Sequence, residues 1–382
     1  MNLLSIQTLD ERLGAIRKLS LPFQERAADN DKTGRFPFEN IEELKNSKYT
    51  ALTVPKEFGG GGISLYELVR LQEAIAVGDG ATSLSIGWHM GMMMNLSEER
   101  PWEPSLLKEV FDYAVNGAVF NTYATEAQTG SPTRGGKPTT LAKRAGDGWS
   151  ITGSKTFSTM APMVDFFVVT ATIEETNEIG SFLVPRHAEG VKMEETWDSI
   201  AMRSTGSHDI ILEQVKVPAH HLAQTSGNRK SSAPGYLLHI PACYLGIAEA
   251  AKREAISFAK NYTPNSLSHP IAELPAIQQK IGEMELKLMQ ARLFLYSVAK
   301  QWDEAQGEER NQLVPELSAA KMTVTNLGIE AVDLAMRIVG ARSLSEKSPL
   351  QRLYRDIRAG LHNPPMDDIT LLQLAKREIN KL

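Results

Sequence analysis

The spacing of apolar residues changes twice along the chain and predicts three segments of different structure. Residues 1–118 carry apolar positions at helical spacing, as in SLYELVRLQEAIAV, which is typical of helices with one buried face. Residues 119–225 alternate apolar and polar positions in short runs such as DFFVVTATI and IILEQVKV, which predicts strands separated by turns. Residues 230–382 return to helical spacing, with an apolar stripe formed by Ile277, Ile281, Met284, Leu288 and Leu295. The pattern therefore predicts a helical domain, a strand domain and an antiparallel helical bundle.

Composition narrows the class of protein. The chain has 382 residues, which is more than one core usually holds and agrees with several domains. Its formal net charge of −5 argues against nucleic acid or an anionic membrane as the main partner. The single cysteine, Cys243, lies in the apolar run HIPACYLGIA, so we expect a buried thiol and no intrachain disulfide. Without a signal-peptide pattern or a membrane span, a cytoplasmic protein is expected, and we expect no metal site.

A polar loop and the strand after it, within residues 122–159, hold the most specific pattern for a ligand. The loop is rich in glycine and small hydroxyl residues, whose backbone N–H groups can approach a flat ligand. After a turn at Gly146–Gly148, the run WSITGSKTFST alternates as a strand does and ends on a ring and two hydroxyls. Such an end can stack on an isoalloxazine ring, although an ordinary surface hairpin is the alternative. The predicted cofactor contacts in this segment are Tyr123, Thr125, Gly130, Ser131, Phe157, Ser158 and Thr159.

The same segment resembles the flavin-binding middle domain of the acyl-CoA dehydrogenase superfamily. It follows that family's order T-E-P-x-x-G-S and then G-D-G-[WY]-x-[IL]-x-G-x-K-x-[WFY]-[IS]-[ST], and further segments match in order, namely VPKEFGGGGISLYELVRLQEAIAVGD, MRSTGSHDIILEQVKVP and SPLQRLYRDIR. The resemblance implies an α+β fold with an N-terminal α-helical domain (1–118), a middle β-barrel domain that binds flavin (119–225) and a C-terminal four-helix bundle (230–382). It also implies a homotetramer.

The resemblance fails where an acyl-CoA dehydrogenase carries its base. The family removes the α-proton of its thioester with a glutamate, located either in the loop before the last helix or in the first helix of the C-terminal bundle. The matching positions here are Pro364 in LHNPPMDD and Tyr236 or a near neighbour, and neither is an acid. Asp367 and Asp368 follow Pro364. We expect them to cap a last helix that begins at Ile369, with recruitment as the base as the alternative.

A second departure concerns the dinucleotide half of FAD. The arginine with which the family binds the pyrophosphate is absent from the matching run TPNSLSHPIAEL. The family's Q-x-x-G-G-x-G element is replaced by RIVGARS at residues 337–343, which keeps a single glycine in place. The resemblance therefore leaves FAD or FMN as the expected cofactor.

These departures resemble a branch of the superfamily, the two-component flavin monooxygenases related to the dibenzothiophene-desulfurising and HpaB-like enzymes. The shared motifs are KTFSTMA, in which Met160 replaces the glycine of the branch, GAR followed by SPLQRLYRDIR, and LHNP. His89 in SIGWHMGM lies where the branch places a pocket histidine. The resemblance implies that a separate flavin reductase supplies reduced flavin, which reacts with O2 to give a C4a-hydroperoxide that oxygenates a small organic or organosulfur substrate.

A flavin hydroperoxide needs a dry pocket with neutral or positive hydrogen-bond donors, because a carboxylate would repel it. The resemblance points to His362 and His89 as these donors, to Ser158 as a contact at flavin N5 and to Phe157 as packing against the ring. For each histidine a purely structural role is the alternative.

Two arginines of the branch motif, Arg355 and Arg358, are three residues apart on a predicted helix. They can bind a flavin phosphate or pair with acidic residues. We therefore expect a flavin monooxygenase. The alternatives are an FAD-dependent acyl-CoA dehydrogenase, with acyl-CoA as substrate and Asp367 or Asp368 as base, and a catalytically silent flavin-binding protein.

Overall fold

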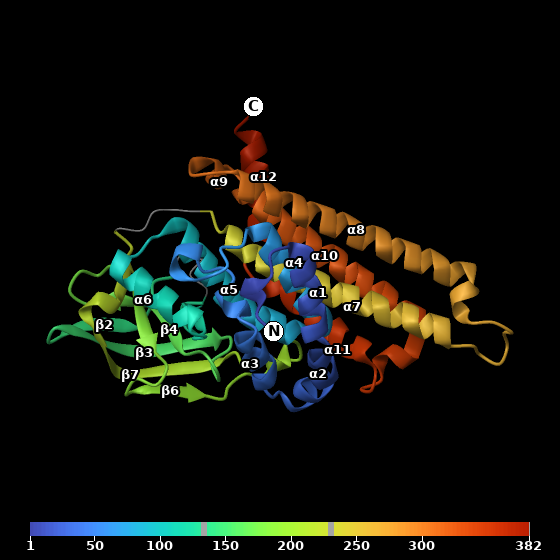
Figure 1. The fold of residues 1–382 in the computed structure, drawn as a ribbon, viewed down its shortest axis with the longest axis horizontal. Helices are drawn as coiled ribbons and strands as arrows, with labels where there is room; N and C mark the ends of the chain where they lie inside the picture. The colour runs from blue at the N-terminus through green and yellow to red at the C-terminus, as the bar shows by residue number, and fades with distance from the viewer. Residues whose placement is uncertain (131–135, 228–232, 382) are drawn as a thin grey trace.

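The computed structural model describes residues 1–130, 136–227 and 233–381. Helices occupy the first and last parts of the chain and a sheet lies between them in sequence, so the predicted three-domain architecture is confirmed (Figure 1). The N-terminal domain consists of helices α1 (Leu9–Leu19), α2 (Leu21–Thr33), α3 (Phe38–Asn46), α4 (Leu65–Gly78), α5 (Gly80–Glu99) and α6 (Pro104–Val115).

Short polar side chains begin these helices. At the start of α1, Oγ1 of Thr8 accepts the backbone N–H of Glu11, and at the start of α4, Oγ of Ser64 accepts that of Glu67. Asp79 separates α4 from α5, and its carboxylate accepts the backbone N–H of Thr82 at 3.1 Å. Helix α5, which includes the methionine run, is buried along most of its length and contacts both α7 and β1. It therefore lies between the sheet and the C-terminal helices.

The middle domain is built on one mixed sheet. Its described strands follow the order β6-β7-β3-β2-β4-β5-β8, with β1 paired in parallel to β4. In the described residues β6 and β8 each pair with one neighbour, so the hydrogen-bonded path stays open. The strands are β1 (Phe120–Tyr123), β2 (Leu141–Ala145), β3 (Gly148–Ser158), β4 (Phe166–Ile173), β5 (Ile179–Pro185), β6 (Val191–Glu194), β7 (His208–Pro218) and β8 (Leu222–Thr225).

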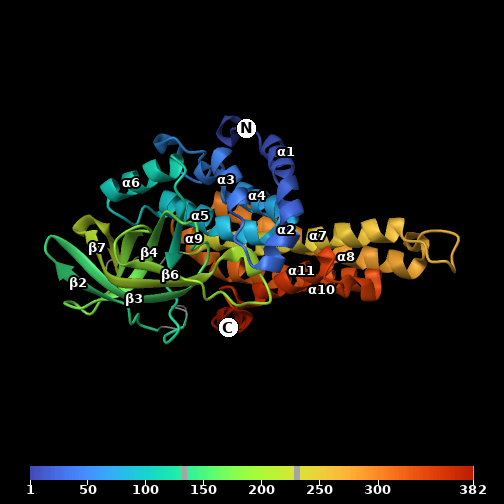
Figure 2. The ribbon, with the colours of Figure 1, turned by 90° about the horizontal axis from the view of Figure 1, so that it is seen from below.

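Long antiparallel helices form the C-terminal domain. Helices α7, α8 and α10 lie side by side in both views, and α12 packs on α10 (Figures 1 and 2). In the predicted stripe Met284, Leu288 and Leu295 are fully buried, as expected for a bundle core. The helices are α7 (His239–Asn261), α8 (Pro275–Glu304), α9 (Glu308–Gln312), α10 (Val314–Val339), α11 (Pro349–Asp356) and α12 (Asp367–Ile379).

The helical domains share one hydrophobic core, because α4 packs closely against α7. A Cβ added to Gly246 on α7 would lie 2.4 Å from the carbonyl oxygen of Glu73, so only glycine permits this approach. Cys243 is buried on the same helix, as predicted. In the described part of the chain, every helix is too short or too polar to cross a membrane.

Candidate functional site

The end of β3 has the shape expected of a surface that stacks on a flat ring. Phe157 adopts a left-handed backbone conformation (φ 54°) that turns its side chain outward, where it is 63% exposed. Its ring contacts Trp197 edge-on, with 5.9 Å between the ring centroids. A large, exposed aromatic ring held in a strained conformation is unusual away from binding surfaces. The strand end therefore offers a ring to a ligand.

Ser158, unlike the exposed Phe157 before it, points into the protein. Its side chain is fully buried, and among the described residues its hydroxyl has no hydrogen-bond partner. Such a group costs free energy unless water or a ligand satisfies it. The ring of Phe157 and the unsatisfied hydroxyl of Ser158 fit a flavin, which has a flat ring and polar edge atoms.

Two residues of β1 hold this strand end in place. The amide of Asn121 donates to the carbonyl oxygen of Thr159 at 2.7 Å, and the hydroxyl of Tyr123 donates to the same oxygen at 3.2 Å. The hydroxyl of Thr159 itself pairs with that of Ser207 at 2.9 Å. Tyr123, predicted as a cofactor contact, is almost fully buried and positions the strand end instead.

The polar loop before β2 is tied to β3 by a buried ion pair. The carboxylate of Glu126 accepts hydrogen bonds from Nζ of Lys155 at 2.5 Å and from the backbone and hydroxyl groups of Thr139 and Thr140. Burial raises the pKa of Glu126, but these hydrogen bonds outweigh it and lower the pKa to about 2. The carboxylate is therefore a structural anchor of the loop.

Three predicted contacts lie in or beside this anchored loop. The carbonyl oxygen of Thr125 accepts the backbone N–H of Thr156 at 3.0 Å, which joins the loop to β3 just before Phe157. Gly130 adopts a left-handed conformation (φ 68°) and donates to the carbonyl oxygen of Glu126. Ser131 lies outside the described residues.

His89 does not have the geometry of the predicted oxygen-side donor. Its Nε2 donates to the carbonyl oxygen of Thr50 at 2.9 Å, and its Nδ1 accepts the backbone N–H of Phe120 at 3.1 Å. Burial lowers the pKa of His89 to about 4, so the ring stays neutral at pH 7. Because both ring nitrogens are engaged with the backbone, the donor prediction is wrong and the structural alternative holds.

The two arginines pair with acids on other helices. Arg355 binds both carboxylate oxygens of Asp31 on α2, and Nη1 lies 3.1 Å from Oδ1. Arg358 binds Asp333 on α10 at 2.8 Å and lies over the ring of Tyr354. Of the two roles open from the sequence, the structure shows the ion-pairing one, and a contact of either arginine with a flavin phosphate stays a prediction.

The loop before α12 carries the remaining predicted residues. His362 is exposed, and the next residue, Asn363, accepts the hydroxyl of Tyr244 on α7. Helix α12 begins at Asp367 rather than at the predicted Ile369, and its N-cap residue makes no side-chain hydrogen bond. Both acids nevertheless lie in the first turn of α12, and Oδ1 of Asp368 accepts the backbone N–H of Ile369 at 2.9 Å, so Asp368 satisfies one N–H group at this helix start.

The carboxylate of Asp367 is held by partners on α10. Asn326 donates to Oδ2 of Asp367 at 2.8 Å, and Nζ of Lys321 lies 3.6 Å from Oδ1. Lys321 is almost fully buried, and both partners of Asp367 belong to α10. These contacts direct the carboxylate of Asp367 towards α10.

A second unsatisfied buried group, His239, was not predicted. It lies at the start of α7, fully buried, with its ring edge-on to Trp88, and neither ring nitrogen has a hydrogen-bond partner among the described residues. Burial lowers the pKa of His239 to about 3. Gly87 and Gly91 on α5 leave room for it, and a Cβ on Gly87 would lie 2.5 Å from its Nδ1. The sequence signal was the spacing of these two glycines, which face one side of a helix.

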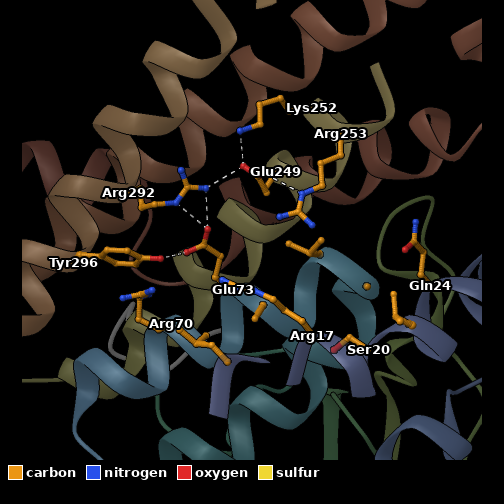
Figure 3. A pocket seen from close by; sticks show the side chains of 15 residues that line it. Arg17, Ser20, Gln24, Arg70, Glu73, Glu249, Lys252, Arg253, Arg292 and Tyr296 are labelled. Carbon is orange, nitrogen blue, oxygen red and sulfur yellow. Dashed lines mark hydrogen bonds and ion pairs between the residues drawn. The ribbon is translucent and has the colours of Figure 1, made fainter. Parts of the chain in front are cut away.

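A charged cavity of about 430 Å³ lies elsewhere, between the N-terminal and C-terminal helices (Figure 3). Its lining residues come from α1, α2, α4, α7, α8 and Ser20, which joins α1 to α2. At its base Arg292 bridges the carboxylates of Glu73 and Glu249, and Tyr296 donates to Glu73 (Figure 3). The acids are thus neutralised by their neighbours, and the network joins α4, α7 and α8 without involving the end of β3.

Comparison with known proteins places the whole chain in one family. The acyl-CoA dehydrogenase N-terminal, middle and C-terminal domains match residues 20–99, 121–215 and 238–363. YdbM of Bacillus subtilis, whose name places it among the acyl-CoA dehydrogenases, is 49% identical over 94% of both chains. A 3-(aryl)acrylate reductase of Clostridium sporogenes is 31% identical over 90% of this chain and 92% of its own.

Solved structures agree on the fold. FMN-bound TdsC from Paenibacillus sp. A11-2, a dibenzothiophene monooxygenase, superposes with a TM-score of 0.87 over 97% of both chains at 23% identity. The domain order, the sheet between helical domains and the family match over nearly the full length lead to one conclusion: the chain belongs to the acyl-CoA dehydrogenase family of flavin oxidoreductases.

Proposed function

We propose that the protein is a reduced-flavin monooxygenase that uses FMN or FAD and acts on a small organic or organosulfur compound. The observation that carries this proposal is the lack of a usable carboxylate at the two positions where the family places its base. These positions are occupied by Pro364 and Tyr236, and the nearest acid of the loop, Asp367, is held by Lys321 and Asn326. The binding of FMN by TdsC supports the cofactor part of the proposal.

Reduced flavin, when bound, supplies the electrons that activate O2. In this proposal Phe157 packs against the ring, Ser158 forms its missing hydrogen bond at the N5 edge, and Thr159 follows at the same strand end. The anchored loop with Thr125 and Gly130 approaches from the neighbouring side, and Ser131 stays a predicted contact. His362, the remaining histidine candidate, serves as a hydrogen-bond donor to the oxygen being transferred.

The cofactor and assembly follow from the same proposal. The run between α7 and α8 lacks an arginine for a pyrophosphate, which favours FMN over FAD.

A separate flavin reductase supplies the reduced cofactor, and the protein assembles as a homotetramer through its helices. Exposed apolar side chains on α8 and α12 support this assembly, namely Leu286, Met289, Leu293, Leu371 and Leu372. Mass analysis of the released cofactor and light scattering test these two points.

An FAD-dependent acyl-CoA dehydrogenase is the second candidate, because the relative YdbM carries that name. It requires Asp367 or Asp368 to act as the base. Asp367 would first have to leave Lys321 and Asn326, and Asp368 is exposed on the first turn of α12.

Two measurements separate the candidates. Anaerobic mixing of the flavin-loaded protein with acyl-CoA thioesters reduces and bleaches the flavin of a dehydrogenase, whereas our proposal predicts no bleaching. When reduced FMN and O2 are supplied with dibenzothiophene or indole as the probe substrate, our proposal predicts an oxygenated product. Formation of this product without reduced FMN and without O2 would refute the proposal. If the protein binds no flavin in these experiments, it is a catalytically silent member of the family and both candidates are refuted.

Variants test the residue roles. Ser158→Ala is expected to weaken flavin binding by about 1 kcal/mol or more, because one hydrogen bond is lost. His362→Ala is expected to retain flavin and release more hydrogen peroxide per product formed. His187→Ala, another exposed histidine in the turn after β5, is the matched control and should leave coupling unchanged. Equal coupling in wild type and His362→Ala would remove His362 from the mechanism.

A further inference from the structure

Two adjacent histidines and one glutamate meet where α6 crosses the end of the sheet. His220 and His221 form the end of a short 3-10 helix between β7 and β8, and Glu109 lies on α6. The carboxylate oxygens of Glu109 lie 3.5 Å from Nε2 of His220 and 3.7 Å from Nε2 of His221. One possible ligand atom from each of the three residues lies within 4.8 Å of the other two.

The buried member of this group is oriented as a metal ligand usually is. Nδ1 of His221 lies 3.0 Å from the carbonyl oxygen of Leu183 on β5, so this nitrogen carries the proton and donates it. In the neutral ring, Nε2 then carries a lone pair that points at the carboxylate of Glu109. A lone pair facing a carboxylate is unfavourable unless a cation or an added proton lies between them. Metal-binding histidines commonly donate a hydrogen bond from their second ring nitrogen, as Nδ1 of His221 does to the carbonyl oxygen of Leu183.

We propose that Glu109, His220 and His221 bind one divalent transition-metal ion, with Zn²⁺ as the best match. Tetrahedral Zn²⁺ with bonds of about 2.0–2.1 Å places neighbouring ligand atoms about 3.3 Å apart. The separations of 3.5 and 3.7 Å involve different oxygens of Glu109, and one ligand atom from each residue lies within 4.8 Å of the other two, so side-chain rotations bring the three atoms together around the ion. Imidazole nitrogen favours Zn²⁺ over Mg²⁺ or Ca²⁺, which prefer oxygen ligands. The side chain of His220 is 58% exposed, which leaves a coordination position open to water.

The position of the site gives the ion a structural role. Glu109 belongs to the N-terminal domain, whereas His220 and His221 belong to the middle domain. Around the site, α6 already packs on the sheet through an apolar cluster that includes Leu107, Phe111 and Leu183. An ion bound across this contact ties α6 to the sheet and stabilises the folded state, because the unfolded chain does not hold the three ligands together.

The test uses the full-length, tag-free protein after treatment with a chelator. Calorimetric titration with ZnCl₂ is expected to show one ion per chain, and Zn²⁺ is expected to raise the melting temperature while Mg²⁺ does not. Glu109→Gln keeps the side-chain shape and His220→Ala changes an exposed residue, so both variants should fold. Each is expected to bind Zn²⁺ at least about tenfold more weakly, since loss of even an outer partner has this effect.

His269→Ala is the matched control. His269 and Glu273 form another partly exposed pair, with Nδ1 and Oε2 3.9 Å apart, but no third candidate ligand joins them among the residues that the structure describes. This variant should bind Zn²⁺ as wild type does. Failure of the wild type to take up Zn²⁺, or equal affinity in wild type, Glu109→Gln and His220→Ala, would overturn the proposal. In that case the group is an ion pair between protonated histidine and glutamate.

Discussion

The ion pair between Glu126 and Lys155 predicts an asymmetry between two single substitutions. Both side chains are almost fully buried, but their remaining partners differ. Glu126 also accepts four hydrogen bonds from Thr139 and Thr140, whereas the other contact of Lys155 is a 3.4 Å approach to the hydroxyl of Thr170. Removing the acid therefore leaves more unsatisfied groups than removing the base.

The expected magnitudes follow from these partners. Glu126→Ala leaves a buried ammonium group and four donors without an acceptor, and should lower the free energy of unfolding by about 3–5 kcal/mol. Lys155→Met fills the same space and leaves the carboxylate with its four remaining donors, so a loss of about 1–3 kcal/mol is expected. Because Glu126 anchors the loop beside Phe157, Glu126→Ala should also weaken flavin binding more than Lys155→Met does.

Equilibrium unfolding in urea, followed by tryptophan fluorescence, measures both losses. The pH dependence adds a second check, since the depressed pKa of Glu126 stabilises the fold above the ordinary value of 4.5, and this contribution is lost as the pH falls towards 2. Glu126→Ala should therefore show a shallower loss of stability in acid. A Lys155→Met variant that is as unstable as Glu126→Ala would refute the reasoning.

Five further substitutions, grouped in three tests, probe packing and charge. Burial raises the pKa of Asp356 to about 7, so the folded state holds a proton that the unfolded chain releases; stability should fall as the pH rises from about 4 to 7, and Asp356→Asn should flatten this profile. In a double-mutant cycle, Arg355→Ala and Asp31→Ala should couple by more than about 1 kcal/mol, and additive effects would contradict a stabilising role for this partly buried pair. Gly87→Ala should lower the melting temperature by overpacking His239, whereas Gly282→Ala, which faces open space on α8, should raise it.

The architecture was predictable because hydrophobic periodicity reports which face of an element is buried. The stripe on α8 and the alternation within β3 and β4 needed no knowledge of distant residues. The same reasoning placed Phe157 and Ser158 together at a strand end, which the structure shows. It missed the start of α12 by two residues, since two acids near a helix start are compatible with a position before or inside the first turn.

The contacts that the sequence did not predict are those between residues far apart along the chain. Arg355 binds Asp31, and the spacing of arginines on one helix does not reveal an acid in another domain. His89 lies in a motif that resembles one in which related enzymes place a pocket histidine. Both of its ring nitrogens nevertheless bond to backbone groups of other segments. The proposed grouping of Glu109 with His220 and His221 could not be predicted from the sequence for the same reason. Local patterns predict which residues are buried, whereas the choice of partner depends on tertiary packing.

The bonds of His89 have a consequence for how related sequences are interpreted. The ring spans from the carbonyl oxygen of Thr50 to the backbone N–H of Phe120, and so fastens a helix of one domain to the first strand of the next. A histidine retained at this position in a relative can then reflect the need for a rigid neutral spacer between domains. Its presence carries no information about oxygen chemistry until the surroundings of both nitrogens are known.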